Sequence, residues 1–164
     1  FYPGSSIGNF APAQALDFLR QLHQAAQGGG LLIGVDLLKP VAVLEAAYDD
    51  PLGVTAAFNR NLLLHLNHLI GSDFALADWR HVAFFDAPQS RIEMHLEARR
   101  SVKVHWPGGQ RAFVAGERIH TENSYKWRAE DFTAFLGDAG FSGIRCWTDE
   151  RGWFAVFLAQ AQRS

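Results

Sequence analysis

The chain contains 164 residues, of which 48% are hydrophobic, 13% aromatic and 20% charged. This composition is that of one domain with a sizeable core, and it disfavours intrinsic disorder. With 15 basic and 17 acidic side chains the formal charge is −2, which provides no long-range attraction for nucleic acid or for an anionic membrane. We therefore expect no nucleic acid and no membrane among its partners.

The single cysteine and the start of the sequence bear on the cellular compartment of the protein and on whether the chain is part of a longer one. Cys146 alone excludes an intramolecular disulfide and a multi-thiolate zinc site. No apolar run reaches the roughly 18 residues of a membrane-spanning helix, and the start, Phe1-Tyr2-Pro3-Gly4, lacks both an initiator Met and a charged signal region. We expect a cytoplasmic protein and a piece of a longer chain.

The first forty residues predict half of an α/β unit. A Gly/Ser turn at residues 4–9 follows a short apolar strand end, and a helix begins near Pro12 and ends before the glycines at 28–30. Residues 31–38 form a near-continuous apolar strand of the kind that a parallel sheet buries on both faces. This strand, helix, strand order predicts a doubly wound sheet.

Residues 41–126 have a different character. Helices are predicted at 41–48 and 53–70, and Gly71 ends the second. The second helix carries an apolar stripe of Val54, Ala57, Phe58, Leu62, Leu66 and Leu69. From 81 to 126 polar and apolar residues alternate, which predicts an antiparallel meander with one face that is wet or lines a cleft.

The chain then returns to helix and strand. A helix is predicted at 128–139, ending at Gly140, and strands at 144–148 and 153–158 close the chain as a hairpin. The predicted fold class is therefore α/β, with a helix-plus-meander block inserted between two α/β segments.

Three segments carry a resemblance to one family. They are FYPGSSIGNF at residues 1–10, YDDPLGVTAAFN at 48–59 and IHTENSYK at 119–126, with further agreement in RIEMHL at 91–96 and WTD at 147–149. Together they resemble the histidine-specific Nα-methyltransferases of ergothioneine biosynthesis, over essentially the whole chain.

The resemblance implies a fold, a reaction and a missing part. Residues 1–40 and 127–164 would be the second half of a Rossmann-like methyltransferase sheet, and residues 41–126 an inserted substrate-binding domain. The implied reaction is trimethylation of the α-amine of L-histidine by S-adenosylmethionine, giving hercynine, with no metal. The first Rossmann half with its glycine-rich cofactor turn is absent, because Gly28-Gly29-Gly30 follows a helix and is not that fingerprint. We expect the chain alone to be inactive, and to self-associate through an exposed sheet edge or to pair with the missing half.

Glu122 and Ser124 are the first candidate substrate-binding residues. They stand two apart in a segment of strand character, so both project from the same face. A carboxylate accepts from one imidazole N–H, while a hydroxyl can bond the other ring nitrogen, and the resemblance assigns this pair to the imidazole. The alternative is a solvated strand end with an incidental Glu and Ser.

The resemblance assigns further residues to the amino-acid end and the cofactor. Asn9 would bind the amine and carboxylate, and the Tyr48 hydroxyl would donate to the carboxylate. Gly4 and Ser5 would let the backbone approach the cofactor closely. The alternatives are a turn-stabilising Asn9 and a half-buried, packing Tyr48. Met94 is either a wall of the substrate site or core filling.

Metal and thiol chemistry are not predicted. His65 and His68 are three apart on a helix but lack a third ligand at suitable spacing, and the other five histidines are scattered among elements. Cys146 lies in a strand predicted to be buried, where it is a small hydrophobe.

Two other functions remain open at this stage. The chain could be a stand-alone binding or interaction module without catalysis, or part of a related methyltransferase acting on a different small amine. The family resemblance favours the histidine methyltransferase over both.

Overall fold

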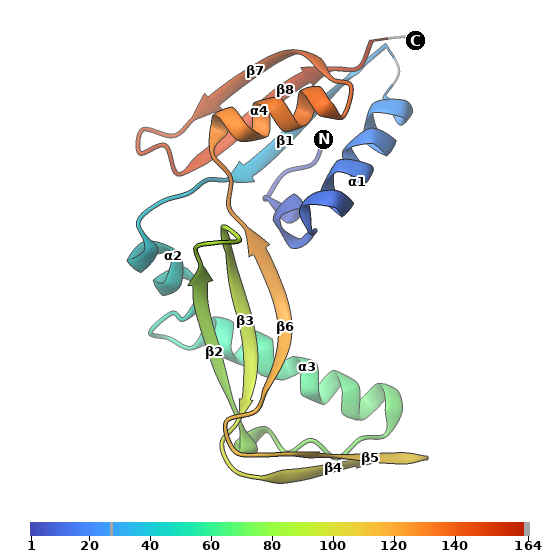
Figure 1. Cartoon of the computed structure of the whole chain (residues 1–164), viewed down its shortest axis with the longest axis vertical. Coiled ribbons are helices and arrows are strands. Elements are labelled where there is room, and N and C mark those ends of the chain that lie inside the picture. Colours follow the sequence, from blue (N-terminus) through green and yellow to red (C-terminus); the bar gives the residue numbers. More distant parts are fainter. Residues whose placement is uncertain (27, 163–164) are drawn as a thin grey trace. The chain divides into compact units, whose positions relative to one another are not determined.

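The computed structural model describes residues 1–26 and 28–162, which fold as two compact units (Figure 1). The sheet unit contains residues 1–40, 86–91 and 123–164, and the meander unit contains residues 41–85 and 92–122. The mixed α/β class predicted from the sequence is confirmed. The roles predicted for the two segments, a cofactor sheet and a substrate-binding insertion, stay predictions.

A three-stranded sheet with two helices forms the sheet unit. Its elements are a short 3-10 helix (Ser6–Asn9), α1 (Pro12–Ala25), β1 (Gly30–Asp36), α4 (Ala129–Asp138), β7 (Ser142–Thr148) and β8 (Phe154–Gln160). The strand order is β1-β8-β7. The 3-10 helix lies where the sequence predicts a Gly/Ser turn, and the other helices and strands lie where the sequence pattern predicts them, within a few residues.

Strand β1 pairs differently on its two edges. Along one edge it runs antiparallel to β8 through seven residues, from Gly30 opposite Gln160 to Asp36 opposite Phe154. On the other edge a parallel bridge joins Tyr2 to Ile33. Within the described residues the predicted parallel pairing is therefore limited to that bridge and one other, while the burial predicted for β1 is confirmed by Ile33 and Val35, which are fully buried.

Aromatic packing closes the core of the sheet unit. Phe132 from α4 is fully buried, and its ring centroid lies 5.1 Å from that of Phe157 on β8 and 5.2 Å from that of Trp127. Leu19 from α1 belongs to the same cluster, so both helices are fixed on the sheet by apolar burial.

Helices and an antiparallel meander form the meander unit. Its elements are α2 (Val41–Tyr48), α3 (Val54–Ile70), a 3-10 turn (Leu76–Asp78), β2 (Trp79–Asp86), β3 (Arg91–Ala98), β4 (Val102–Trp106), β5 (Gly109–Phe113) and β6 (Arg118–Tyr125). The last residues of β2 and β6 and the first of β3 fall in the sheet unit. The strands form two sheets, β2-β3-β6 and β4-β5, which confirms the predicted meander. None of the helices in the described part of the chain combines the length and apolar character that a bilayer crossing needs.

Strand β3 is more deeply buried than its alternation predicts. Every residue from 92 to 98 is buried, so the prediction of a solvent-exposed face at Met94 is wrong. Met94 is 3% exposed and packs with Leu44 and Ile92, which is the core-filling alternative. The reason is that β3 is the central strand of its sheet, between β2 and β6.

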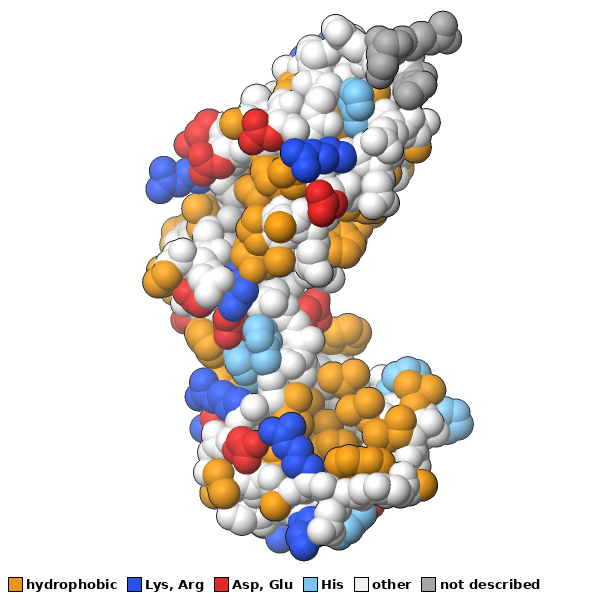
Figure 2. Space-filling model, turned by 45° about the vertical axis from the view of Figure 1, so that its right-hand side comes forward, with side chains coloured by type: hydrophobic (Ala, Val, Ile, Leu, Met, Phe, Trp, Pro, Cys, Tyr) orange, Lys and Arg blue, Asp and Glu red, His pale blue; other side chains and the backbone are white. Residues whose placement is uncertain are grey.

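The apolar stripe of α3 faces away from the core. Val54, Phe58 and Leu69 are each at least 60% exposed, whereas the buried residues of the helix are Asn59 and Leu63. Figure 2 shows hydrophobic side chains gathered on a face of the meander unit. Asn59 tolerates burial because its amide donates to the His95 carbonyl at 3.1 Å and to His81 Nδ1 at 2.9 Å.

Cys146 is also misplaced by the sequence prediction. It is exposed, because β7 is the outer strand of the order β1-β8-β7 and its residues from 145 to 148 face solvent. Partial burial of the sulfur still raises the pKa of the thiol above its ordinary value, which keeps it in the less nucleophilic protonated form.

The first turn of α3 is held by a carboxylate four residues upstream of the helix start. Gly53, at the N-cap, has no side chain to accept a hydrogen bond. Asp50 replaces it: Oδ1 accepts from the Thr55 N–H at 2.8 Å and Oδ2 from the Val54 N–H at 3.0 Å. These backbone donors, Thr55 foremost, lower the pKa of Asp50 to about 2.

Replacement of Asp50 by Ala should fray the start of α3 and lower the thermal midpoint of unfolding. Because the folded-state pKa is depressed, the stabilisation is complete above the ordinary value of 3.8 and is lost as the pH falls towards about 2. Thermal unfolding at several pH values should therefore show a difference between wild type and Asp50→Ala near neutral pH that disappears near pH 2. Asp49→Ala, a neighbouring exposed carboxylate, is the control, and an equal effect of the two substitutions would contradict the capping role.

Candidate functional site

Glu122 lines a cavity of about 250 Å³ in the meander unit. The lining residues come from α3 and from β6, and they are Phe58, Asn59, Asn61, Leu62, His65, Thr121 and Glu122. Among the predicted substrate-binding residues, Glu122 is the one that borders this cavity. Phe58 and Leu62, members of the exposed stripe of α3, provide its apolar wall.

The polar groups of this cavity are held in place. Thr121 Oγ1 donates to the Met94 carbonyl at 2.9 Å, which fixes β6 against β3. Because Asn59 Nδ2 donates to His81 Nδ1, the opposite nitrogen of His81 carries the proton and donates to the Tyr48 carbonyl at 2.7 Å. An apolar wall beside a carboxylate acceptor suits a flat ring with an N–H at its edge.

Ser124 lies in the sheet unit, buried at the end of β6. Its Oγ accepts a hydrogen bond from Lys126 Nζ at 2.7 Å. The opening turn packs closely against it: a Cβ on Gly8 would lie 2.9 Å from the Tyr125 carbonyl oxygen and 3.6 Å from Ser124 Oγ. Glycine at position 8 therefore allows the turn to approach this end of β6.

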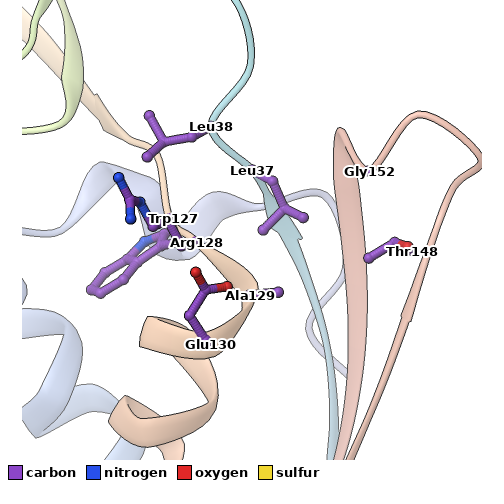
Figure 3. Close-up of a pocket in the computed structure, with 8 residues that line it drawn as sticks. All are labelled: Leu37, Leu38, Trp127, Arg128, Ala129, Glu130, Thr148 and Gly152. Atoms are coloured by element: carbon purple, nitrogen blue, oxygen red, sulfur yellow. The ribbon is translucent and has the colours of Figure 1, made fainter.

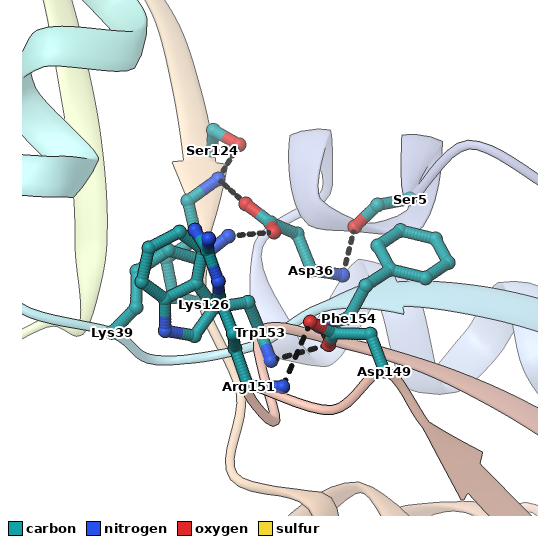
Figure 4. A network of polar contacts seen from close by, with 9 residues as sticks. All are labelled: Ser5, Asp36, Lys39, Ser124, Lys126, Asp149, Arg151, Trp153 and Phe154. Carbon is teal, nitrogen blue, oxygen red and sulfur yellow. Dashed lines mark hydrogen bonds and ion pairs between the residues drawn. The ribbon is translucent and has the colours of Figure 1, made fainter.

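A polar network links the turn, β1 and the segment after β6 (Figure 4). Asp36 is its centre. The Asp36 N–H donates to Ser5 Oγ at 2.7 Å, Lys39 Nζ donates to Asp36 Oδ1 at 2.5 Å, and Lys126 Nζ lies 3.0 Å from Asp36 Oδ2. The network thus brings together two of the predicted residues, Ser5 and Ser124, through Asp36 and Lys126.

Residues of the opening turn have an unusual backbone. Gly4 and Ser5 have φ values of +77° and +58°, in the left-handed region that glycine adopts readily and serine rarely. The bond from the Asp36 N–H to Ser5 Oγ holds this conformation. Asn9 ends the following 3-10 helix and is exposed, so its amide is accessible.

Tyr48 ends α2 and is half-buried. It packs against the cluster of Leu44, Ile92 and Met94, as the packing alternative predicts. In the described part of the chain it does not border the cavity of Glu122. Its role towards a substrate carboxylate stays a prediction.

Sequence reasoning missed a cluster of Glu93, His95 and His120, whose candidate ligand atoms lie within 4.8 Å of one another. His95 and His120 are 25 residues apart, so only the pairing of β3 with β6 brings them together. Their rings are stacked, with centroids 4.6 Å apart and planes inclined by 19°. Glu93 and the two imidazoles are residue types that can hold a metal ion.

A hydrogen bond and a second stacked ring hold His95 in this position. Its Nε2 donates to Glu93 Oε2 at 2.8 Å. The Phe84 ring stacks on the opposite face, with the two ring centroids 5.3 Å apart and the ring planes inclined by 12°. Burial lowers the pKa of His95, and the hydrogen bond to Glu93 opposes the shift. A neutral, stacked imidazole is consistent with a packing role for this cluster.

A second cavity, of about 280 Å³, opens in the sheet unit beyond the carboxyl end of β1 (Figure 3). Its lining residues are Leu37, Leu38, Trp127, Arg128, Ala129, Glu130, Thr148 and Gly152. The carboxyl ends of strands are where open α/β sheets bind ligands, but none of the predicted substrate-binding or cofactor-binding residues lines this cavity. The pattern gave no signal because the lining comes from three separate segments.

Comparisons with known proteins identify the family. Residues 1–161 match the family of histidine-specific, SAM-dependent methyltransferases. Histidine N-alpha-methyltransferase of Mycolicibacterium smegmatis is 44% identical over 159 residues, which are 95% of this chain and 50% of that protein. The protein of the same name from Mycobacterium tuberculosis gives the same values.

Two further matches are weaker. Ergothioneine biosynthesis protein 1 of Neurospora crassa is 30% identical over 165 residues, which are 98% of this chain and 18% of that protein. Among solved structures, the CcbJ methyltransferase of Streptomyces caelestis is 14% identical, with a TM-score of 0.46, and the match covers 97% of this chain and 58% of that one.

The chain spans about half the length of the two mycobacterial relatives, whose C-terminal half it matches. The family match, by contrast, leaves only the last three residues of this chain outside it. On this evidence the chain belongs to the family of histidine-specific, SAM-dependent methyltransferases, as its sequence resemblance predicts.

Proposed function

We propose that this chain is the histidine-recognising half of an enzyme that methylates the α-amine of L-histidine three times with S-adenosylmethionine, giving hercynine. The observation that carries the proposal is the family match over residues 1–161. The Glu122 carboxylate beside an apolar cavity wall supports it, since an imidazole needs both an acceptor for its N–H and a surface for its ring.

Each end of the substrate has an assigned group. Glu122 accepts from one imidazole N–H, and Ser124, two residues along β6, bonds the other ring nitrogen. Asn9 bonds the amine and carboxylate through its amide, and the Tyr48 hydroxyl donates to the carboxylate. A site that grips all three polar parts of histidine rejects amines that lack one of them.

The chemistry requires orientation more than acid–base power. When bound, S-adenosylmethionine supplies an electrophilic methyl group on sulfur. The protein has to align the deprotonated amine of histidine with that methyl group, so the groups that fix the two ends of the amino acid provide the main rate advantage.

The opening turn fits one side of a cofactor site. Gly4 has a left-handed φ, and a Cβ placed there would meet no atom within 4 Å, so the backbone is open to close approach by a ligand. Ser5 is held beside it by the Asp36 N–H. The remaining cofactor contacts belong to the other half of the enzyme, with which we propose that this chain pairs.

The 164-residue chain should not bind S-adenosylhomocysteine on its own. A fusion in which the N-terminal half of the Mycolicibacterium smegmatis relative precedes it, hereafter the extended enzyme, should bind this ligand and methylate L-histidine. Calorimetric titration of both proteins, with mass spectrometry of the product, tests the proposal. Tight binding by the chain alone would contradict its dependence on a second half, and an extended enzyme that binds cofactor but leaves histidine unmodified would contradict the substrate.

In the extended enzyme, Glu122→Ala should weaken histidine binding by about 1.5–3 kcal/mol, the range for a hydrogen bond to a charged group. This corresponds to a rise in Kd of roughly 10- to 150-fold. Calorimetry with L-histidine and S-adenosylhomocysteine measures it. Glu150→Ala, an exposed carboxylate in the turn between β7 and β8, is the control and should leave histidine affinity unchanged. Unchanged affinity in Glu122→Ala would remove Glu122 from the imidazole site.

A further inference from the structure

Asn59 is an unexpected residue for the buried side of α3. It is 3% exposed, and both of its amide hydrogens are used on the neighbouring strands, because Nδ2 donates to the His95 carbonyl at 3.1 Å and to His81 Nδ1 at 2.9 Å. A backbone carbonyl can only accept, so the atom that faces it is the amide nitrogen, and the orientation of the amide is fixed. The group that Asn59 has left to offer is Oδ1, an acceptor.

The bond between Asn59 and His81 also has a fixed direction. His81 Nε2 lies 2.7 Å from the Tyr48 carbonyl and has to donate to it, so the ring proton is on Nε2 and the lone pair is on Nδ1. Nδ1 therefore accepts the second hydrogen of the Asn59 amide. Two backbone carbonyls thus determine the directions of all three hydrogen bonds, and the amide cannot turn over without losing its own two.

Thr121 is restricted in the same way. Its hydroxyl donates its one hydrogen to the Met94 carbonyl at 2.9 Å, so Oγ1 has only lone pairs left. Glu122, the next residue on β6, has a carboxylate that accepts when ionised, whatever its other contacts. Asn59, Thr121 and Glu122 all line the cavity of about 250 Å³ in the meander unit. Both α3 and β6 therefore contribute acceptors of fixed character to this cavity.

A cavity whose fixed polar groups are acceptors selects the charge of its ligand. An N–H donates to an oxygen lone pair, whereas a ring nitrogen with its own lone pair is repelled by it. Hydrogen bonds to the charged form of a group also favour that form. Phe58 in the same lining acts in the same direction, since the faces of aromatic rings attract cations. All of these residues belong to the meander unit.

We propose that this cavity binds the ring of histidine as an imidazolium cation, and that Asn59 is a specificity-determining residue for the charge of the ring. This inference rests on the proposed function. Glu122 accepts from one ring N–H, as assigned above. The oxygens of Asn59 and Thr121 favour a proton over a lone pair on the other ring nitrogen.

A cationic ring serves the methylation chemistry. The α-amine has to be deprotonated when it attacks the methyl group. A positive charge on the ring of the same molecule disfavours a second positive charge on the amine, because like charges repel. The charge that the cavity selects therefore lowers the pKa of the amine, which leaves a larger fraction of it in the reactive form.

Nitrogen NMR of ring-labelled L-histidine, bound to the extended enzyme together with S-adenosylhomocysteine, reports the protons on the ring directly. In wild type both ring nitrogens should still be protonated at about pH 8, more than one unit above the ordinary imidazole pKa of about 6.5. Asn59→Ala should lower the pKa of the bound ring by roughly half a unit to one unit, because an oriented acceptor is lost. A wild-type complex in which one ring nitrogen is unprotonated at this pH would overturn the inference.

Asn61→Ala and His65→Ala are the matched controls. Asn61 lines the same cavity from the same helix, but its amide is exposed and pairs with solvent, and His65 is the titratable side chain of the lining besides Glu122. Both variants should leave the ring doubly protonated at about pH 8. An equal fall of the ring pKa in Asn61→Ala and Asn59→Ala, or a fall in His65→Ala alone, would contradict the role of Asn59.

A second variant covers the case in which Asn59→Ala does not fold, since Asn59 is buried. Thr121→Val replaces another acceptor with a methyl group of similar size and should also lower the pKa of the bound ring. A wild-type ring pKa in whichever of the two variants folds would overturn the inference, and the wild-type measurement decides it if neither folds. Histidine methylation by wild type upholds the proposed function in each of these cases, whereas its absence would overturn both.

Discussion

The arrangement of the polar residues in the sheet unit depends on the contacts of Asp36. Asp36 ends β1, and through its N–H and its two oxygens it holds Ser5 of the opening turn, Lys39 and Lys126. Its backbone N–H holds Ser5 in a left-handed conformation, and its carboxylate forms an ion pair with the buried ammonium of Lys126. A single residue thus links three segments, the opening turn through its backbone N–H and residues 39 and 126 through its carboxylate.

This interaction works because apolar packing makes the end of β1 rigid. Ile33 and Val35 are fully buried, and β1 is paired with β8 along its whole length. Asp36 therefore lies at the end of a strand that is held by both packing and pairing. Polar groups at a strand end are positioned as accurately as the core beneath them is packed, which is why open α/β sheets place their ligands there.

The sequence predicts elements better than it predicts which way they face. The glycines at 28 to 30, 71 and 140 and the proline at 12 locate the ends of helices because their backbone preferences are local. The stripe of α3 shows the opposite case. Periodicity establishes that an apolar face exists, but the direction of that face depends on tertiary packing, and here the buried side contains Asn59, whose amide finds two acceptors on β2 and β3.

The residues of the candidate site also fall into two groups, those that the sequence predicts and those that only the structure reveals. Glu122 and Ser124 could be singled out because strand spacing and family resemblance act over a few residues. The neighbours that give them their chemistry could not: Phe58 and Leu62 come from α3, about sixty residues earlier, and Asp36 almost ninety before Ser124. Lys126 was visible only as the last letter of a motif. Its burial beside Asp36 depends on the chain folding back across ninety residues, so no local pattern could distinguish it from an ordinary surface lysine.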